Sequence, residues 1–138
     1  MTEPSKANRW VGYVLSALPV LLMALSSIMK LSRQPMVVEG FAKSGMSTAL
    51  VVAIGSIELI CVLIYLVPST SVLGAVLITG YMGGAVMVHL RAQEATAIVP
   101  FLLGVFAWGG LYLRDPRIRE LLPIRSRRRA TSGAPRAQ

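Results

Sequence analysis

Four long apolar stretches, separated by short polar segments, make up most of the chain. They cover residues 10–29, 45–67, 71–90 and 95–113. Each is close to the roughly 20 residues that an α-helix needs to cross a hydrocarbon core about 30 Å thick. Backbone amides in lipid have to be paired within their own segment, so helices are expected rather than open strands. The pattern predicts an all-α membrane protein with four transmembrane helices.

The connections between the apolar stretches are short. The longest, residues 30–44, is expected to be a loop, because it contains a proline and a glycine; residues 68–70 and 91–94 are expected to be tight turns. Short connections force neighbouring helices to run antiparallel, which predicts an up-down-up-down bundle. The sequence Arg114-Asp115-Pro116 is expected to end the last helix, because proline cannot continue the helical hydrogen-bond pattern.

The pattern divides the chain into three regions. Residues 1–9 form an amino-terminal tail, residues 10–113 the transmembrane domain, and residues 114–138 a basic carboxyl-terminal tail. Within this tail, the amphipathic segment 118–124 is expected to lie on the membrane surface, and residues 126–138 are expected to be disordered. A cleavable signal peptide is the alternative for the first stretch, although its apolar run is longer than the usual 7–15 residues.

Composition and charge agree with a chain whose main solvent is lipid. Hydrophobic residues make up 54% and charged residues 14%, whereas soluble domains carry about 25% charged residues. The net charge of +8 does not indicate nucleic-acid binding, because eight of the 14 basic residues follow the last apolar stretch and no recognition motif accompanies them. Such a segment is a topology signal and a contact for anionic lipid. Ten basic residues fall on the side of the two termini and four on the other side, which predicts cytoplasmic termini.

Glu58 is the most informative polar residue, because it lies inside the second apolar stretch. A carboxylate near the bilayer centre costs about 2.5–3.5 kcal/mol on insertion scales, so its side chain is expected to face the bundle interior. If all four helices start at the same depth, its candidate partners are Ser16, Thr79 and Tyr81. Glu58 is then either a proton-relay or ligand-binding carboxyl, or a polar clasp between helices.

The third apolar stretch contains the segment Gly80-Tyr81-Met82-Gly83-Gly84. Gly80 and Gly84 form a small-xxx-small pair, which lets helices approach closely in lipid. Gly80, Gly83 and Gly84 are therefore predicted to mediate helix packing, with a groove for a ligand as the alternative. The segment is not a phosphate loop, because it lacks the Gly-Lys-Ser/Thr ending.

Charged residues are also predicted to gather at the end of the bundle away from the termini. These residues are Lys30, Glu39, His89 and Arg91. His89 is expected to titrate near neutral pH and to pair with Glu39. The cluster is either a ring of charges that anchors the helix ends or a pocket for an anionic or quinone headgroup. A single histidine is a poor metal site, so no metal is expected, and the role of Cys61, the one cysteine, cannot be inferred.

Several segments resemble the DoxX-like family of small bacterial membrane proteins. They are Lys30-Leu31, Val38-Glu39-Gly40-Phe41 with Gly45, Ile57-Glu58-Leu59, the run from Thr79 to Ala85 with His89-Leu90-Arg91, and the ending from Trp108 to Arg117. The resemblance covers roughly residues 11–125. It implies a four-helix bundle in the bacterial cytoplasmic (inner) membrane and, through the wider family, an association with quinone-coupled sulfur oxidation or oxidative-stress defence. It assigns no catalytic residues.

Three functions are consistent with these observations. The first is an accessory or scaffold subunit of a redox system, with a membrane or periplasmic oxidoreductase as its partner. The second is a quinone- or lipid-binding redox protein with Glu58 and Tyr81 near the bound ring. The third is a small proton-coupled transporter with Glu58 as relay, which four helices would support best as a homodimer. The sequence contains no recognisable catalytic or cofactor motif, which favours a role other than that of an enzyme.

Overall fold

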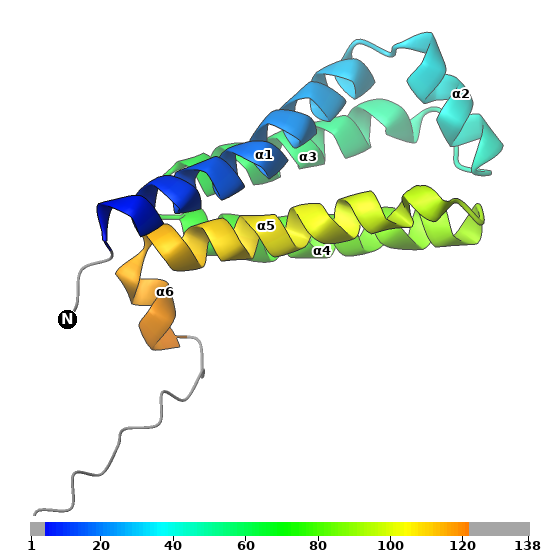
Figure 1. Cartoon of the computed structure of the whole chain (residues 1–138). Helices are drawn as coiled ribbons and strands as arrows, with labels where there is room; N and C mark the ends of the chain where they lie inside the picture. The colour runs from blue at the N-terminus through cyan, green and yellow to red at the C-terminus, as the bar shows by residue number, and fades with distance from the viewer. Residues whose placement is uncertain (1–4, 122–138) are drawn as a thin grey trace, which may run out of the picture.

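The computed structural model of the protein describes residues 5–121, and these fold into helices joined by short connections (Figure 1). The elements are α1 (Lys6–Leu31), α2 (Pro35–Lys43), α3 (Leu50–Leu66), α4 (Ser71–Arg91), the 3-10 turn η1 (Ala95–Ala97), α5 (Ile98–Arg114) and α6 (Pro116–Leu121). No strand occurs in this part of the chain, so the all-α class is confirmed. Three apolar segments, α1, α4 and η1 with α5, are long enough to cross a membrane, whereas α3 has 17 residues.

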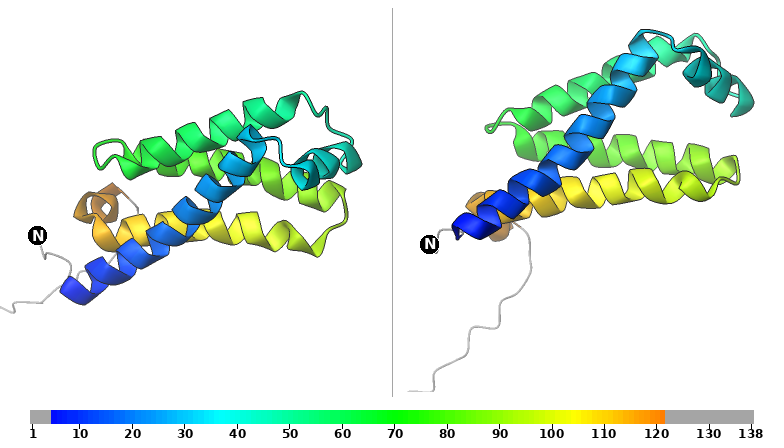
Figure 2. Two further views of the ribbon diagram at one scale, coloured as in Figure 1. Left: turned by 90° about the horizontal axis from the view of Figure 1, so that it is seen from above. Right: turned by 45° about the horizontal axis from the view of Figure 1, so that its top comes forward.

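Successive long helices run in alternating directions, and α1 crosses its neighbours at a slant (Figure 2). Helix α1 packs against α3 and α5, while α4 packs against the other faces of α3 and α5. Helix α1 begins at Lys6, ahead of its apolar stretch, because the Ser5 side chain accepts a hydrogen bond from the Asn8 amide at 3.3 Å. Because the long helices alternate in direction, the start of α1 and the end of α5 lie at the same end of the bundle (Figure 1).

The segment 30–44 is not a simple loop, because it contains α2. Pro35 occupies the first helical turn, where its fixed φ favours a helix and its missing N–H is not needed. Arg33 before α2 and Gly45 after it have left-handed backbone conformations, with φ of 50° and 70°. No residue of α2 is fully buried. The connections expected at 68–70 and 91–94 are turns, although Arg91 still belongs to α4, and α5 ends at Arg114.

Four glycines, namely Gly12, Gly55, Gly74 and Gly110, allow the helices to approach closely. A Cβ atom on Gly12 would lie 2.9 Å from the Gly110 carbonyl oxygen, where α1 crosses α5. A Cβ atom on Gly55 would lie 2.6 Å from the Lys30 Cβ, where α3 meets α1, and one on Gly74 would overlap the α3 backbone. These contacts are the close helix approaches that small residues permit in lipid.

The glycines for which packing was predicted do not take part in such contacts. At Gly80, Gly83 and Gly84, a Cβ atom would meet no heavy atom within 4 Å in the described chain. Their spacing places them on an open face of α4, and all three line cavities. Within the described residues these glycines therefore pack closely against no other helix, and the groove alternative stays a prediction.

Aromatic and basic side chains gather where α1 begins and α5 ends. The Arg114 guanidinium lies 5.8 Å from the Tyr13 ring centre and 5.1 Å from that of Tyr65. Arg119 donates a hydrogen bond to the Tyr112 carbonyl oxygen at 3.1 Å. Ile118, 1% exposed, packs α6 against the core. The amphipathic segment predicted over 118–124 coincides in part with α6; residues 122–124 and the tail 126–138 lie outside the described residues.

Candidate functional site

A buried ion pair joins α1 to α3. Glu58 on α3 is 2% exposed, and its Oε2 atom accepts hydrogen bonds from Lys30 Nζ at 2.7 Å and from Ser26 Oγ at 3.2 Å. Lys30 also donates a hydrogen bond to Ser26. Ser26 and Lys30 are four residues apart and therefore lie on the same face of α1. Glu58 thus connects two helices, but through residues other than those predicted.

Two of the three predicted partners of Glu58 have other roles. Ser16 accepts a hydrogen bond from the Tyr65 hydroxyl at 3.0 Å, and Thr79 accepts one from the Trp108 indole at 2.7 Å. The assumption of equal depth fails because α1 is slanted, so its carboxyl-terminal turns lie against the middle of α3 (Figure 2). The spacing of Ser26 and Lys30 was the available signal, but Lys30 was assigned to the helix end.

The ion pair faces a cavity of about 270 Å³ between α1, α3, α4 and α5, which we call the ion-pair cavity. A second cavity of about 540 Å³, the α2 cavity, lies between α2, α3 and α4. Four residues line both cavities: Lys30, Tyr81, Ala85 and His89. The two spaces therefore meet at a corner that carries an ammonium group, a phenol and an imidazole. Of the predicted partners of Glu58, only Tyr81 lies beside it there.

His89 pairs with Glu94 and not with Glu39. Its Nδ1 atom lies 2.7 Å from Glu94 Oε2, and the Thr96 hydroxyl donates to the same carboxylate at 3.2 Å. Gln93, with φ of 56°, turns the chain sharply so that Glu94 lies next to the end of α4. Glu39 and Arg91 are exposed and line neither cavity, so the predicted charge cluster is divided.

We expect the Glu94 contacts to make stability pH-dependent in acid. The hydrogen bonds from His89 and Thr96 lower the pKa of Glu94 below its ordinary value near 4.5. A lowered carboxyl pKa contributes stability above the ordinary value, and this contribution is lost as the pH falls through the lowered pKa. The difference in unfolding midpoint between the wild type and Glu94→Gln should therefore shrink as the pH falls below about 4.5. A difference that stays unchanged down to pH 2 would contradict this coupling.

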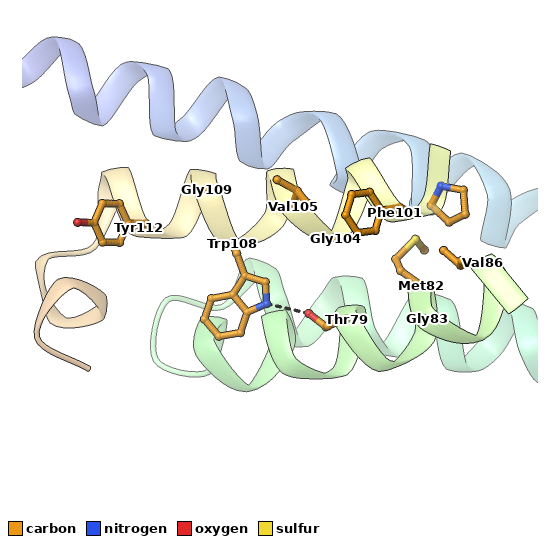
Figure 3. A pocket seen from close by; sticks show the side chains of 11 residues that line it. Thr79, Met82, Gly83, Val86, Phe101, Gly104, Val105, Trp108, Gly109 and Tyr112 are labelled. Atoms are coloured by element: carbon orange, nitrogen blue, oxygen red, sulfur yellow. Dashed lines mark hydrogen bonds between the residues drawn. The ribbon is translucent and has the colours of Figure 1, made fainter. Parts of the chain in front are cut away.

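A third cavity, the α4/α5 groove, is about 540 Å³ in volume and lies along the outer face of α4 and α5 (Figure 3). It is lined by Thr79, Met82, Gly83, Val86, Pro100, Phe101, Gly104, Val105, Trp108, Gly109 and Tyr112. The Trp108 indole and the Thr79 hydroxyl satisfy each other across it. The groove therefore presents mainly hydrocarbon surface.

Long apolar helices around a buried ion pair define this protein as a helical membrane protein with a polar site in its interior. The chain matches the DoxX-like family over residues 14–110, and it belongs to that family. This match contains α2, α3, α4 and the residues of the ion pair. The comparisons with curated proteins and with solved structures returned no match.

The corner between the ion-pair and α2 cavities can donate hydrogen bonds to a ligand. Lys30 and Tyr81 carry polar hydrogens, and Glu58 neutralises the charge of Lys30. The described residues contain no group of three or more His, Cys, Asp or Glu side chains that could hold a metal ion. Cys61 is buried on α3 and forms no disulfide. The arrangement suits non-covalent binding of a polar head beside apolar walls.

Proposed function

We propose that the protein crosses the bacterial cytoplasmic membrane four times, with α3 as the shortest span. At about 1.5 Å per residue, the 17 residues of α3 reach about 26 Å, near the lower limit for a transmembrane helix. An even number of spans agrees with the position of the start of α1 and the end of α5 at one end of the bundle. Ten basic residues on that side against four on the other support cytoplasmic termini.

We propose further that the protein binds a quinone-class ligand in its interior. The observation that carries this proposal is the Lys30–Glu58 pair, which faces the ion-pair cavity, while Lys30 also lines the adjoining α2 cavity. Lys30 and Tyr81 supply hydrogen bonds for a ring carbonyl oxygen, which can only accept them. Apolar side chains such as Phe41 and Ile57 supply the walls against which a flat ring packs.

The charge of the site favours a neutral ligand over an anionic one. The positive charge of Lys30 is compensated by Glu58 at 2.7 Å, and His89 lies 2.7 Å from the Glu94 carboxylate. A second negative charge beside Glu58 would be repelled in this low-dielectric environment. A quinone ring carries oxygen acceptors without a net charge, so it fits the site better than a carboxylate or phosphate.

The two other functions, an accessory subunit and a proton-coupled transporter, relate to this proposal in different ways. A protein that holds a quinone can present it to an oxidoreductase, so an accessory role in a membrane redox system follows directly from the binding function. A proton-coupled transporter would need Glu58 to bind and release protons. The Oε2 atom of Glu58 instead accepts hydrogen bonds from Lys30 and Ser26, which favours a role as a clasp between helices. Recovery of an oxidoreductase with the protein from solubilised membranes would support the accessory role.

Binding can be measured as stabilisation of the purified protein in detergent. A decyl-tailed benzoquinone should raise the unfolding midpoint, because a ligand that binds the folded state alone stabilises it. Tyr81→Phe removes one hydrogen-bond donor and should weaken the affinity by about 2- to 10-fold, as expected for about 0.5–1.5 kcal/mol. Tyr13→Phe, at the opposite end of the bundle, is the matched control. The absence of any shift in the wild type, or an equal loss in both variants, would contradict the proposal.

A further inference from the structure

The α4/α5 groove and the ion-pair cavity share two lining residues. These are Met82 from α4 and Pro100 from the first turn of α5. Met82 is unbranched and flexible, so it can change rotamer without disturbing the helices. Met82 therefore lies between the polar site and the outer face of the bundle.

The groove is open because both helices contribute glycines to its lining. A Cβ atom on Gly83 would meet nothing within 4 Å, and one on Gly104 would meet only the Met82 Cβ at 4.0 Å. Phe101 and Val105, 56% and 49% exposed, form its outer rim. The space thus runs along α5 from Phe101 to Tyr112, which is about 16 Å at about 1.5 Å per residue.

We infer that the α4/α5 groove holds the hydrocarbon tail of the ligand whose polar head lies at Lys30 and Glu58. This inference rests on the proposed quinone-binding function and adds to it the class of ligand, a lipid-soluble molecule with a long chain. The tail passes between Met82 and Pro100 and then lies along α5. A tail directed into the α2 cavity would instead meet the polar residues Ser44 and Glu94 at the end of the bundle.

The size of the groove favours a chain over a helix of a second copy. An α-helix with its side chains is about 10 Å wide, so a helix of a second copy could place only side chains in the groove. A hydrocarbon chain is narrow enough to enter it. The groove also adjoins the polar site, so a chain that lies in the groove can belong to a ligand whose polar head lies in that site.

The test compares two benzoquinones with the same ring, one without a tail and one with a decyl tail, at equal concentrations in the micelle. The wild type should bind the tailed form roughly tenfold more tightly, which corresponds to about 1.4 kcal/mol. Gly83→Leu fills the groove and should abolish this preference while leaving the affinity for the tail-less ring unchanged. Leucine also favours a helix more than glycine does, so the variant should fold.

Two further variants complete the test. Val105→Phe narrows the groove from α5 and should also remove the preference for the tail. Val76→Phe adds the same number of carbon atoms as Gly83→Leu on α4, at an exposed position outside the described cavities, and should retain the preference.

Each outcome separates the tail inference from the proposed function. If the wild type binds both quinones equally, the tail inference is overturned and quinone binding stands. If neither quinone binds, both are overturned. If Gly83→Leu changes the oligomeric mass in detergent and leaves the preference for the tail intact, the groove belongs to a second copy and the inference fails.

Discussion

Lys30→Met is expected to lower the free energy of unfolding by about 3–5 kcal/mol, because it leaves the Glu58 carboxylate buried without its cation. Glu58→Gln should cost less, about 1–3 kcal/mol, since the amide can still accept a hydrogen bond. The Lys30 side chain is 14% exposed and that of Glu58 is 3% exposed. A long lysine side chain can redirect its charge toward the end of the bundle, whereas Glu58 cannot leave the interior. Unfolding followed in one detergent provides the measurement.

A double variant distinguishes a lost ion pair from lost packing. Lys30→Met combined with Glu58→Met replaces both charges with apolar side chains and should recover most of the lost stability. Lys43→Met, at an exposed position on α2, should change stability by less than about 0.5 kcal/mol. If Lys30→Met proved as mild as Lys43→Met, the ion pair would have no role in holding α1 to α3.

Gly110→Ala is expected to destabilise the protein by about 2–3 kcal/mol, because the added methyl group has no space. Its Cβ would lie 2.7 Å from the Ser16 amide nitrogen and 2.8 Å from the Gly12 carbonyl oxygen. Both are backbone atoms, so relief would require α1 and α5 to move apart. The unfolding midpoint in detergent, compared with that of the wild type, would measure the effect.

The adjacent glycine is a natural control. A Cβ atom on Gly109 would meet nothing within 4 Å, so Gly109→Ala should raise stability by about 0.5–1 kcal/mol through helix propensity alone. Two substitutions one residue apart are thus expected to have opposite signs. Equal effects would mean that α1 and α5 do not cross at Gly110.

The helices could be predicted from hydropathy because each long apolar run has one stable conformation in lipid. The turns predicted at 68–70 and 91–94 followed from the same reasoning. Helix α2 could not be predicted in this way, because it is short and Pro35, which is expected to lie in a loop, begins a helix. Local sequence therefore determines where the chain is helical, but leaves the meaning of a proline open.

The candidate site was predictable only in part. The burial of Glu58 followed from the position of a carboxylate in an apolar run, and it is confirmed by its exposure of 2%. Its partner was not predictable, because the tilt of α1 decides which residue lies opposite, and tilt comes from contacts between helices. The same limitation explains the glycines: the spacing of Gly80 and Gly84 does not say which face of α4 meets another helix, whereas Gly110 lies at a crossing.

Helix α2 forms one wall of the α2 cavity but packs only loosely against the long helices. None of its residues is fully buried, and it is bounded by Arg33 and Gly45, both in the left-handed conformation. Segments with few buried contacts open locally at a small fraction of the free energy of global unfolding. Water and protons can therefore reach Lys30 through a local excursion of α2 while the long helices stay packed. If a partner oxidoreductase reduced a bound quinone to the quinol, the two protons taken up would come from the aqueous phase on that side of the membrane, while the tail lies in the α4/α5 groove.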